Sequence, residues 1–180
     1  AQADPAYNFG AIGGVIGHEI SHSFDNNGAA FDSTGKMRNW WTDADRAKFN
    51  AAGKALAEQY DQYEPFPGLR VNGKLTLGEN IADVAGLAAA YDAYRASLKG
   101  KEAPVIDDFS GDQRFFIAYA QSWSTKMREE ALRGRIATDG HAPGQYRAQT
   151  VRNLDPWYGA FGVKPGQKLY LAPEQRVKVW

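Results

Sequence analysis

Residues 18–22 read HEISH, and they lie inside a longer stretch, residues 5–26, with the sequence PAYNFGAIGGVIGHEISHSFDN. Apolar residues recur along this stretch at helical spacing, and Pro5 is tolerated close to a helix start. Side chains four positions apart lie on one face of a helix, one turn from each other. The sequence therefore predicts a helix that presents two imidazoles side by side, with a carboxylate next to them.

Two imidazoles in this arrangement can bind one Zn²⁺, and Glu19 then lies within reach of a metal-bound water. A catalytic zinc site has three protein ligands and an open position. The competing interpretation is a pair of surface histidines beside an ordinary glutamate. Burial of the helix over much of its surface argues against it, because a buried unpaired glutamate is costly. The apolar side chains that predict this burial are Val15, Ile16, Ile20 and Phe24.

Glycines at positions 10, 13, 14 and 17 lower the helix propensity of the same stretch. A helix that retains so many glycines is expected to pack closely against a neighbouring segment or a ligand.

The third metal ligand must come from elsewhere, and the one other histidine is His141. The best carboxylate is Glu79, at the start of a strongly apolar helix. Glu79 and Asp83 share a helix face, so one can bind metal while the other accepts the N–H of a ligating histidine. Alternatively, Glu79 is an acid favoured by the helix dipole. Asp25 can orient His22, or it is a solvated residue near a helix end.

The remainder of the chain predicts a mainly α-helical domain with a small β contribution. The predicted elements are helices over about residues 42–63, 78–98 and 112–134, a β-hairpin over 69–77 around Asn72-Gly73, and short helices and turns towards the end. Of the 180 residues, 43% are hydrophobic, and 21 basic residues balance 21 acidic ones. No basic field indicates nucleic acid, and no apolar run approaches the roughly 20 residues of a membrane span. The absence of cysteine excludes disulfides and thiolate ligands.

Two motifs together carry a family resemblance. GHEISHSFDNNG at 17–28 followed by TLGENIADVAGL at 76–87 closely resembles the neprilysin and endothelin-converting-enzyme family of zinc metallopeptidases. The likeness continues in AYAQSW at 118–123 and DGHAPGQYR at 139–147 and covers in effect the whole chain. It implies a gluzincin-type catalytic domain: an HExxH helix, a second helix carrying the third ligand, and a small β-hairpin.

The resemblance also implies roles for individual residues. One Zn²⁺ per chain would be held by His18, His22 and Glu79. The catalytic group would comprise Glu19 as general base, His141 as donor to the oxyanion, and Asp83.

Other implied roles are supporting ones. Asp83 would hold His18, Asp25 would hold His22, and Asp139 would orient His141. Arg147 would bind a substrate backbone carbonyl, and Val15 and Trp123 would line the pocket for the side chain after the cleaved bond. Without the family resemblance, the sequence would indicate only a loop histidine at His141 and a surface charge at Arg147.

The implied activity is hydrolysis of internal bonds in oligopeptides. Residues 1–180 are expected to be the C-terminal catalytic core of a longer protein whose N-terminal domain and substrate-binding strand lie outside this chain. We expect zinc binding to survive in the chain alone, with peptidase activity weak or absent. The alternative is a zinc-stabilised binding module that does not cleave. The resemblance and the lack of cysteine together imply a bacterial-type member, secreted or in the periplasm or cell envelope.

Overall fold

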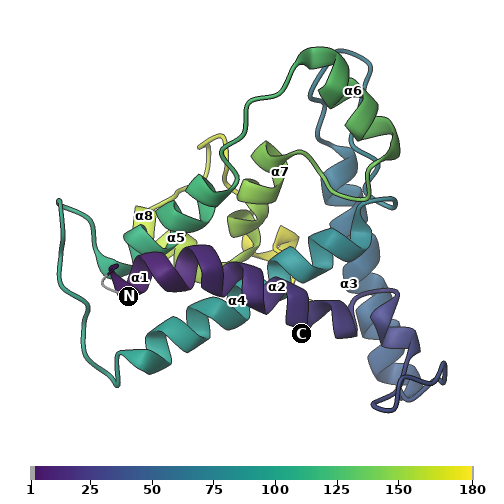
Figure 1. The fold of residues 1–180 in the computed structure, drawn as a ribbon, viewed down its shortest axis with the longest axis horizontal. Helices are drawn as coiled ribbons and strands as arrows, with labels where there is room; N and C mark the ends of the chain where they lie inside the picture. Colours follow the sequence, from purple (N-terminus) through teal and green to yellow (C-terminus); the bar gives the residue numbers. More distant parts are fainter. Residues whose placement is uncertain (1–2, 180) are drawn as a thin grey trace.

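A computed structural model describes residues 3–179, and the chain there is mainly helical (Figure 1). Its α-helices are α1 Pro5–Asn8, α2 Gly14–Ser21, α3 Asp43–Asp61, α4 Leu77–Ser97, α5 Gly111–Ser122, α6 Glu129–Thr138, α7 Gly144–Ala148 and α8 Asp155–Phe161. A π-helix covers Phe9–Gly13, and 3-10 helices cover His22–Phe24, Gly28–Ala30, Gln149–Asn153 and Pro173–Gln175. None of the helices within residues 3–179 has the length and hydropathy to cross a membrane.

The HEISH motif lies at the end of a row of helical segments formed by α1, the π-helix and α2 (Figure 1). Asp4 caps α1 by accepting a hydrogen bond from the Ala6 N–H at 3.3 Å, and Pro5 occupies the first turn. His18 and Glu19 belong to α2, and His22 begins the 3-10 turn that follows it.

Glycines allow this row to pack closely against two other helices. A Cβ atom at Gly10 would overlap the carbonyl oxygen of Phe115 on α5, and one at Gly17 would overlap that of Gly86 on α4. A Cβ atom at Gly86 would in turn overlap the backbone nitrogen of His18. The expected close packing of the glycine-rich helix is therefore confirmed, and the crossing of α2 and α4 places His18 directly against α4.

The expected burial of the flanking apolar side chains is wrong. These side chains are 42–63% exposed: Val15, Ile16, Ile20 and Phe24. The reason is that α2 packs onto α4 through its glycines and His18, which leaves its larger apolar residues on the opposite side. The result is an apolar face of α2, formed by Val15, Ile16 and Ile20, that residues 3–179 cover only in part.

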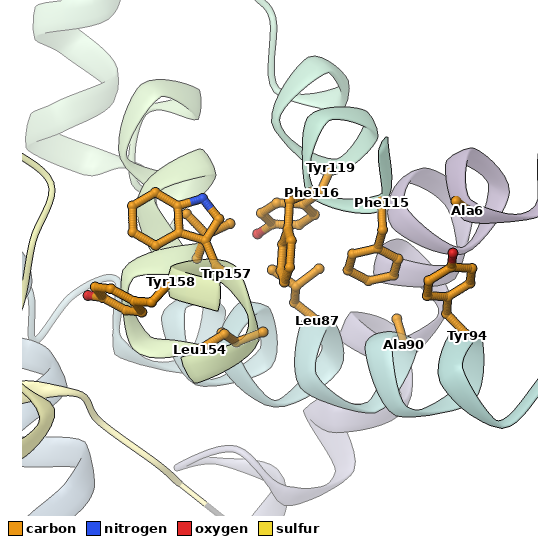
Figure 2. Close-up of a cluster of buried hydrophobic side chains, with 11 residues drawn as sticks. Ala6, Leu87, Ala90, Tyr94, Phe115, Phe116, Tyr119, Leu154, Trp157 and Tyr158 are labelled. Atoms are coloured by element: carbon orange, nitrogen blue, oxygen red, sulfur yellow. The ribbon is translucent and has the colours of Figure 1, made fainter. Parts of the chain in front are cut away.

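Two buried clusters fix α4 in place. In the first, Phe115 and Phe116 of α5 lie over Leu87 and Tyr94 of α4, with Trp157 of α8 at its end (Figure 2). In the second, apolar residues of α3 pack against the N-terminal half of α4. Because both clusters include α4, the helix is held from two directions, and its residues 80–87 are buried.

The hairpin predicted over residues 69–77 does not form. In residues 3–179, β pairing is limited to isolated bridges. Asn72 instead turns the chain into α4, because its carbonyl accepts from the Thr76 N–H at 3.0 Å. Gly73 lies against the backbone of α3 and is not among the glycines with positive φ. A two-residue hairpin turn of the Asn-Gly kind needs positive φ at both positions, so the close helix contact takes precedence.

The single helix predicted over residues 112–134 is two helices, α5 and α6, separated by residues 123–128. Trp123 leaves the helix with φ −92° and ψ 2°. Its carbonyl lies against Gly144, where an added Cβ would come within 2.7 Å, and its ring lies under the Arg147 guanidinium. These contacts with a distant segment override the local helical preference, and no periodicity in the sequence reveals them.

Candidate metal centre

Three side chains predicted as ligands converge at the crossing of α2 and α4. His18, His22 and Glu79 each offer a ligand atom, and these atoms lie within 4.8 Å of one another. His18 Nε2 is 3.1 Å from His22 Nε2 and 3.1 Å from Glu79 Oε2. His22 Nε2 is 3.5 Å from Glu79 Oε1.

These separations suit a tetrahedral ion. Bonds of about 2.0–2.1 Å at a tetrahedral angle place neighbouring ligand atoms about 3.3 Å apart. Glu79 Oε2 is buried and makes no hydrogen bond, even though His18 Nε2 and His141 Nε2 lie 3.1 and 3.2 Å away. A buried carboxylate oxygen without a hydrogen bond needs a partner, and a metal ion can supply it. Imidazole nitrogens together with a carboxylate oxygen are ligands that zinc accepts. The residues present therefore fit a zinc ion.

Carboxylates make this position favourable for positive charge. Burial opposes protonation of His18, but the nearby carboxylates of Asp83 and Glu79 outweigh burial and raise its pKa to about 9. Burial likewise opposes the charge on Glu79, yet the contact with His18 leaves its pKa below the usual value. A cation at this point, whether a proton or a metal, is stabilised by the same groups.

Each candidate ligand histidine has a carboxylate on its other ring nitrogen. His18 Nδ1 lies 2.9 Å from Asp83 Oδ1, and His22 Nδ1 lies 2.7 Å from Asp25 Oδ2. Asp25 is itself fixed, because its Oδ1 accepts from the N–H groups of Asn27 and Gly28, both at 2.7 Å. This arrangement holds both rings with Nε2 facing the centre.

Arg147 is buried beneath the centre and holds Asp83 with two hydrogen bonds. Its Nε and Nη2 donate to the two carboxylate oxygens of Asp83, each at 2.8 Å. Its guanidinium carbon lies 3.9 Å from the centre of the Trp123 ring. Sequence reasoning missed the pair of Arg147 with Asp83, because the partners are 64 positions apart and no local pattern connects them.

His141 reaches the centre from the segment between α6 and α7. Its Nε2 lies 3.2 Å from Glu79 Oε2, and its Nδ1 lies 2.7 Å from Asp139 Oδ1. The backbone N–H of His141 also donates to Asp139, and this bond is the largest cause of the lowering of the Asp139 pKa to about 2. Arg135, one turn earlier on α6, pairs with Asp139 at 2.7 Å, a partner that i,i+4 spacing alone could have suggested.

Three predicted site residues lie at the surface, and one of them is His141, whose side chain is 45% exposed. Glu19 is exposed on α2 and has no hydrogen bond or ion pair to any residue in 3–179. Val15 is 42% exposed. Trp123 lines a groove of about 790 Å³ together with His141 and Arg147, and Val15 is not part of that lining. The structure therefore does not join Val15 and Trp123 in one pocket.

A protein family and several known proteins are similar to this chain. The profile of peptidase family M13 matches residues 1–177. The neutral endopeptidase of Lactobacillus helveticus is 44% identical over 176 residues, which cover 96% of this chain and 25% of that protein. Neprilysin-1 of Caenorhabditis elegans is 40% identical over 187 residues, covering 100% of this chain and 24% of that protein.

A solved structure is also similar to this chain. The Mycobacterium tuberculosis zinc metalloprotease Zmp1, in complex with an inhibitor, superposes with a TM-score of 0.97 at 48% identity, over 99% of this chain and 28% of that one. This chain spans about a quarter of the length of the curated relatives that it matches. The family prediction made from the two sequence motifs is confirmed, because the profile covers nearly every residue. The chain belongs to peptidase family M13.

Proposed function

We propose that this chain is the zinc-binding catalytic part of a longer endopeptidase that hydrolyses internal bonds of oligopeptides. The observation that carries the proposal is the convergence of His18, His22 and Glu79, with ligand atoms within 4.8 Å of one another. These three residues would hold one zinc ion. When bound, zinc supplies a Lewis acid that polarises a carbonyl and lowers the pKa of water.

Glu19 is proposed as the general base, taking a proton from the attacking water and delivering it to the leaving amine. Its carboxylate has no partner within residues 3–179, so both oxygens are open to water and substrate. His141 is proposed as donor to the oxyanion through Nε2. The Asp139 carboxylate, 2.7 Å from Nδ1, would hold the His141 ring with Nε2 towards the centre.

Arg147 is proposed to bind a backbone carbonyl of the peptide. Asp83 engages its Nε and Nη2, while Nη1 has no hydrogen-bond partner in the described part of the chain. Because the guanidinium is planar and held by Asp83, its Nη1 donor points in a fixed direction. It can therefore orient the peptide as well as bind it. Asp83 would thereby position both His18 and Arg147.

We further propose that this chain is one part of a larger protein. Support comes from the relatives, which are about four times as long, and from the exposed apolar face of α2. Ile16 and Ile20 are 54% and 63% exposed, and a face of this kind is usually buried against a partner. The rest of the polypeptide is the proposed partner. The proposed location, secreted or in the periplasm or cell envelope, rests on family membership alone.

A chimera tests the function directly. This chain would replace the matching quarter of the Lactobacillus helveticus neutral endopeptidase, and cleavage of oligopeptides would be followed by mass spectrometry. We expect Glu19→Gln to keep its zinc and to lower kcat by at least about 10²-fold, because proton transfer loses its base.

The control is Glu130→Gln, an exposed glutamate of α6 outside the site, which should leave kcat unchanged. Turnover by Glu19→Gln at the rate of the control would contradict the assigned role. A chimera that holds zinc but cleaves nothing, with Glu19 intact, would favour the zinc-stabilised binding module.

A further inference from the structure

The helix that carries Arg147 is short and is held in place by its neighbours. α7 has five residues, Gly144–Ala148, which are too few to form a stable helix alone in water. It lies between α5 and α3 (Figure 1), and each of these helices contributes one buried tyrosine whose hydroxyl bonds to its backbone. The position of α7 therefore depends on contacts with these two helices.

Tyr119 of α5 bonds to the backbone of Arg147 itself. Its hydroxyl donates to the Arg147 carbonyl oxygen at 3.2 Å. The residue is 3% exposed and belongs to the first buried cluster, together with Leu87 and Phe116 (Figure 2). Burial raises the pKa of Tyr119 well above its usual value, so the hydroxyl keeps its proton and remains a donor.

Tyrosines of α3 hold the residues on either side of Arg147. The hydroxyl of Tyr60 donates to the Tyr146 carbonyl oxygen at 3.4 Å and lies 3.0 Å from the Thr150 hydroxyl. The ring of Tyr63 stacks on that of Tyr146, with centroids 4.3 Å apart. These contacts fix the neighbours of Arg147, and the bond from Tyr119 fixes its own peptide unit.

The guanidinium end of Arg147 is held as well. Its Nε and Nη2 donate to Asp83, each at 2.8 Å, and its guanidinium carbon lies 3.9 Å from the centre of the Trp123 ring. An arginine side chain has several rotatable bonds, so its free donor points in one direction only if both ends of the side chain are fixed. Asp83 holds the charged end, and Tyr119 holds the backbone end.

We propose that Tyr119 is a positioning residue: by holding the carbonyl of Arg147, it keeps Nη1 of that arginine directed at a backbone carbonyl of the peptide. The proposal rests on the proposed function, which assigns that carbonyl to Arg147. Tyr119 acts through Arg147 and takes no part in the chemistry. Loss of its hydroxyl is therefore expected to weaken peptide binding and to leave the zinc content and the chemical step unchanged.

Tyr119→Phe tests this role, because it removes the hydroxyl and keeps the ring in the core. The control is Tyr94→Phe: Tyr94 belongs to the same cluster, and its buried hydroxyl makes no hydrogen bond within residues 3–179. In the chimera described above, Tyr119→Phe should raise KM about fivefold, the worth of one neutral hydrogen bond, without changing kcat. Tyr94→Phe should leave KM unchanged.

A second substitution shows whether the effect passes through Arg147. Arg147→Lys keeps a positive charge beside Asp83 but loses the rigid fork of donors. Adding Tyr119→Phe to Arg147→Lys should then raise KM no further, since the donor that Tyr119 directs is gone. The same rise in both backgrounds, or no rise in either, would overturn the proposal.

Hydrogen exchange of the chain alone gives a readout that needs no cleavage. The Arg147 Nε–H signal would be followed by NMR and identified by its absence from Arg147→Lys. Tyr119→Phe should speed its exchange about fivefold relative to the backbone amide of Leu87, whereas a general loss of stability would speed both equally.

An unchanged ratio of the two exchange rates would contradict the proposal. If the unmodified chimera holds zinc but cleaves nothing, the proposed function fails. The exchange rates still decide in that case whether Tyr119 holds Arg147 in place.

Discussion

Asp83 connects the candidate ligands to the buried arginine beneath them. Its Oδ1 lies 2.9 Å from His18 Nδ1 and 2.8 Å from Arg147 Nη2, and its side chain is 1% exposed. The same carboxylate neutralises Arg147, whose side chain is 10% exposed. Removing one member of a buried ion pair leaves the other charge without compensation, which costs far more than losing a surface pair.

Asp83→Ala should accordingly lower the free energy of unfolding of the zinc-free chain by about 3–5 kcal/mol, measured by urea denaturation. Glu129→Ala is the matched control, because Glu129 forms an exposed i,i+4 pair with Arg133 and should cost no more than about 0.5 kcal/mol. Similar costs for the two variants would mean that Asp83 does not neutralise a buried charge.

For single residues, the sequence predicts the geometry within one helix well, but it predicts partners that are far apart in the sequence poorly. The four-residue spacing of His18 and His22 predicts that their rings meet, and their Nε2 atoms lie 3.1 Å apart. The spacing of Glu79 and Asp83 likewise predicts a shared face, and both contact His18. The pairing of Asp83 with Arg147 depends on how α7 packs, which no spacing within one helix encodes.

Among the elements, the crossing of α2 and α4 determines whether the site forms. Gly17 and Gly86 allow the two backbones to touch at the level of His18. The glycine-rich stretch predicts close packing, but it does not identify the partner helix. Where the sequence prediction failed, a contact with another element prevailed: Gly73 against α3 replaces a hairpin, and Trp123 against Gly144 interrupts a helix.

Gly17→Ala should therefore lower the free energy of unfolding by about 1–3 kcal/mol, because its Cβ would overlap the Gly86 carbonyl and separate the helices. Zinc affinity should fall with it, since His18 and Glu79 sit on the two separated helices. Gly134→Ala is the control: it lies within α6, nothing lies near its added Cβ, and it should raise stability by about 0.4–1 kcal/mol. If both substitutions stabilise the chain, the close crossing is not needed.

For the molecule as a whole, the mainly helical class and the family were predictable from two motifs and helical spacing. The exposure of the apolar face of α2 was not. Val15, Ile16 and Ile20 look like core residues in sequence, and whether a helix face is buried depends on what covers it. The candidate metal centre, by contrast, draws its ligands from α2, the turn after it and α4. The two clusters hold α4, and α2 packs onto α4 through Gly17 and Gly86, all within this chain. We therefore expect metal binding to need no other part of a larger protein.

Elemental mass spectrometry of the purified, dialysed chain tests this account most directly. We predict about one zinc per chain at neutral pH, lost from Glu79→Ala and retained by Glu174→Ala, an exposed glutamate far along the chain. Absence of metal after zinc is offered, or full retention of zinc by Glu79→Ala, would contradict a centre built from His18, His22 and Glu79.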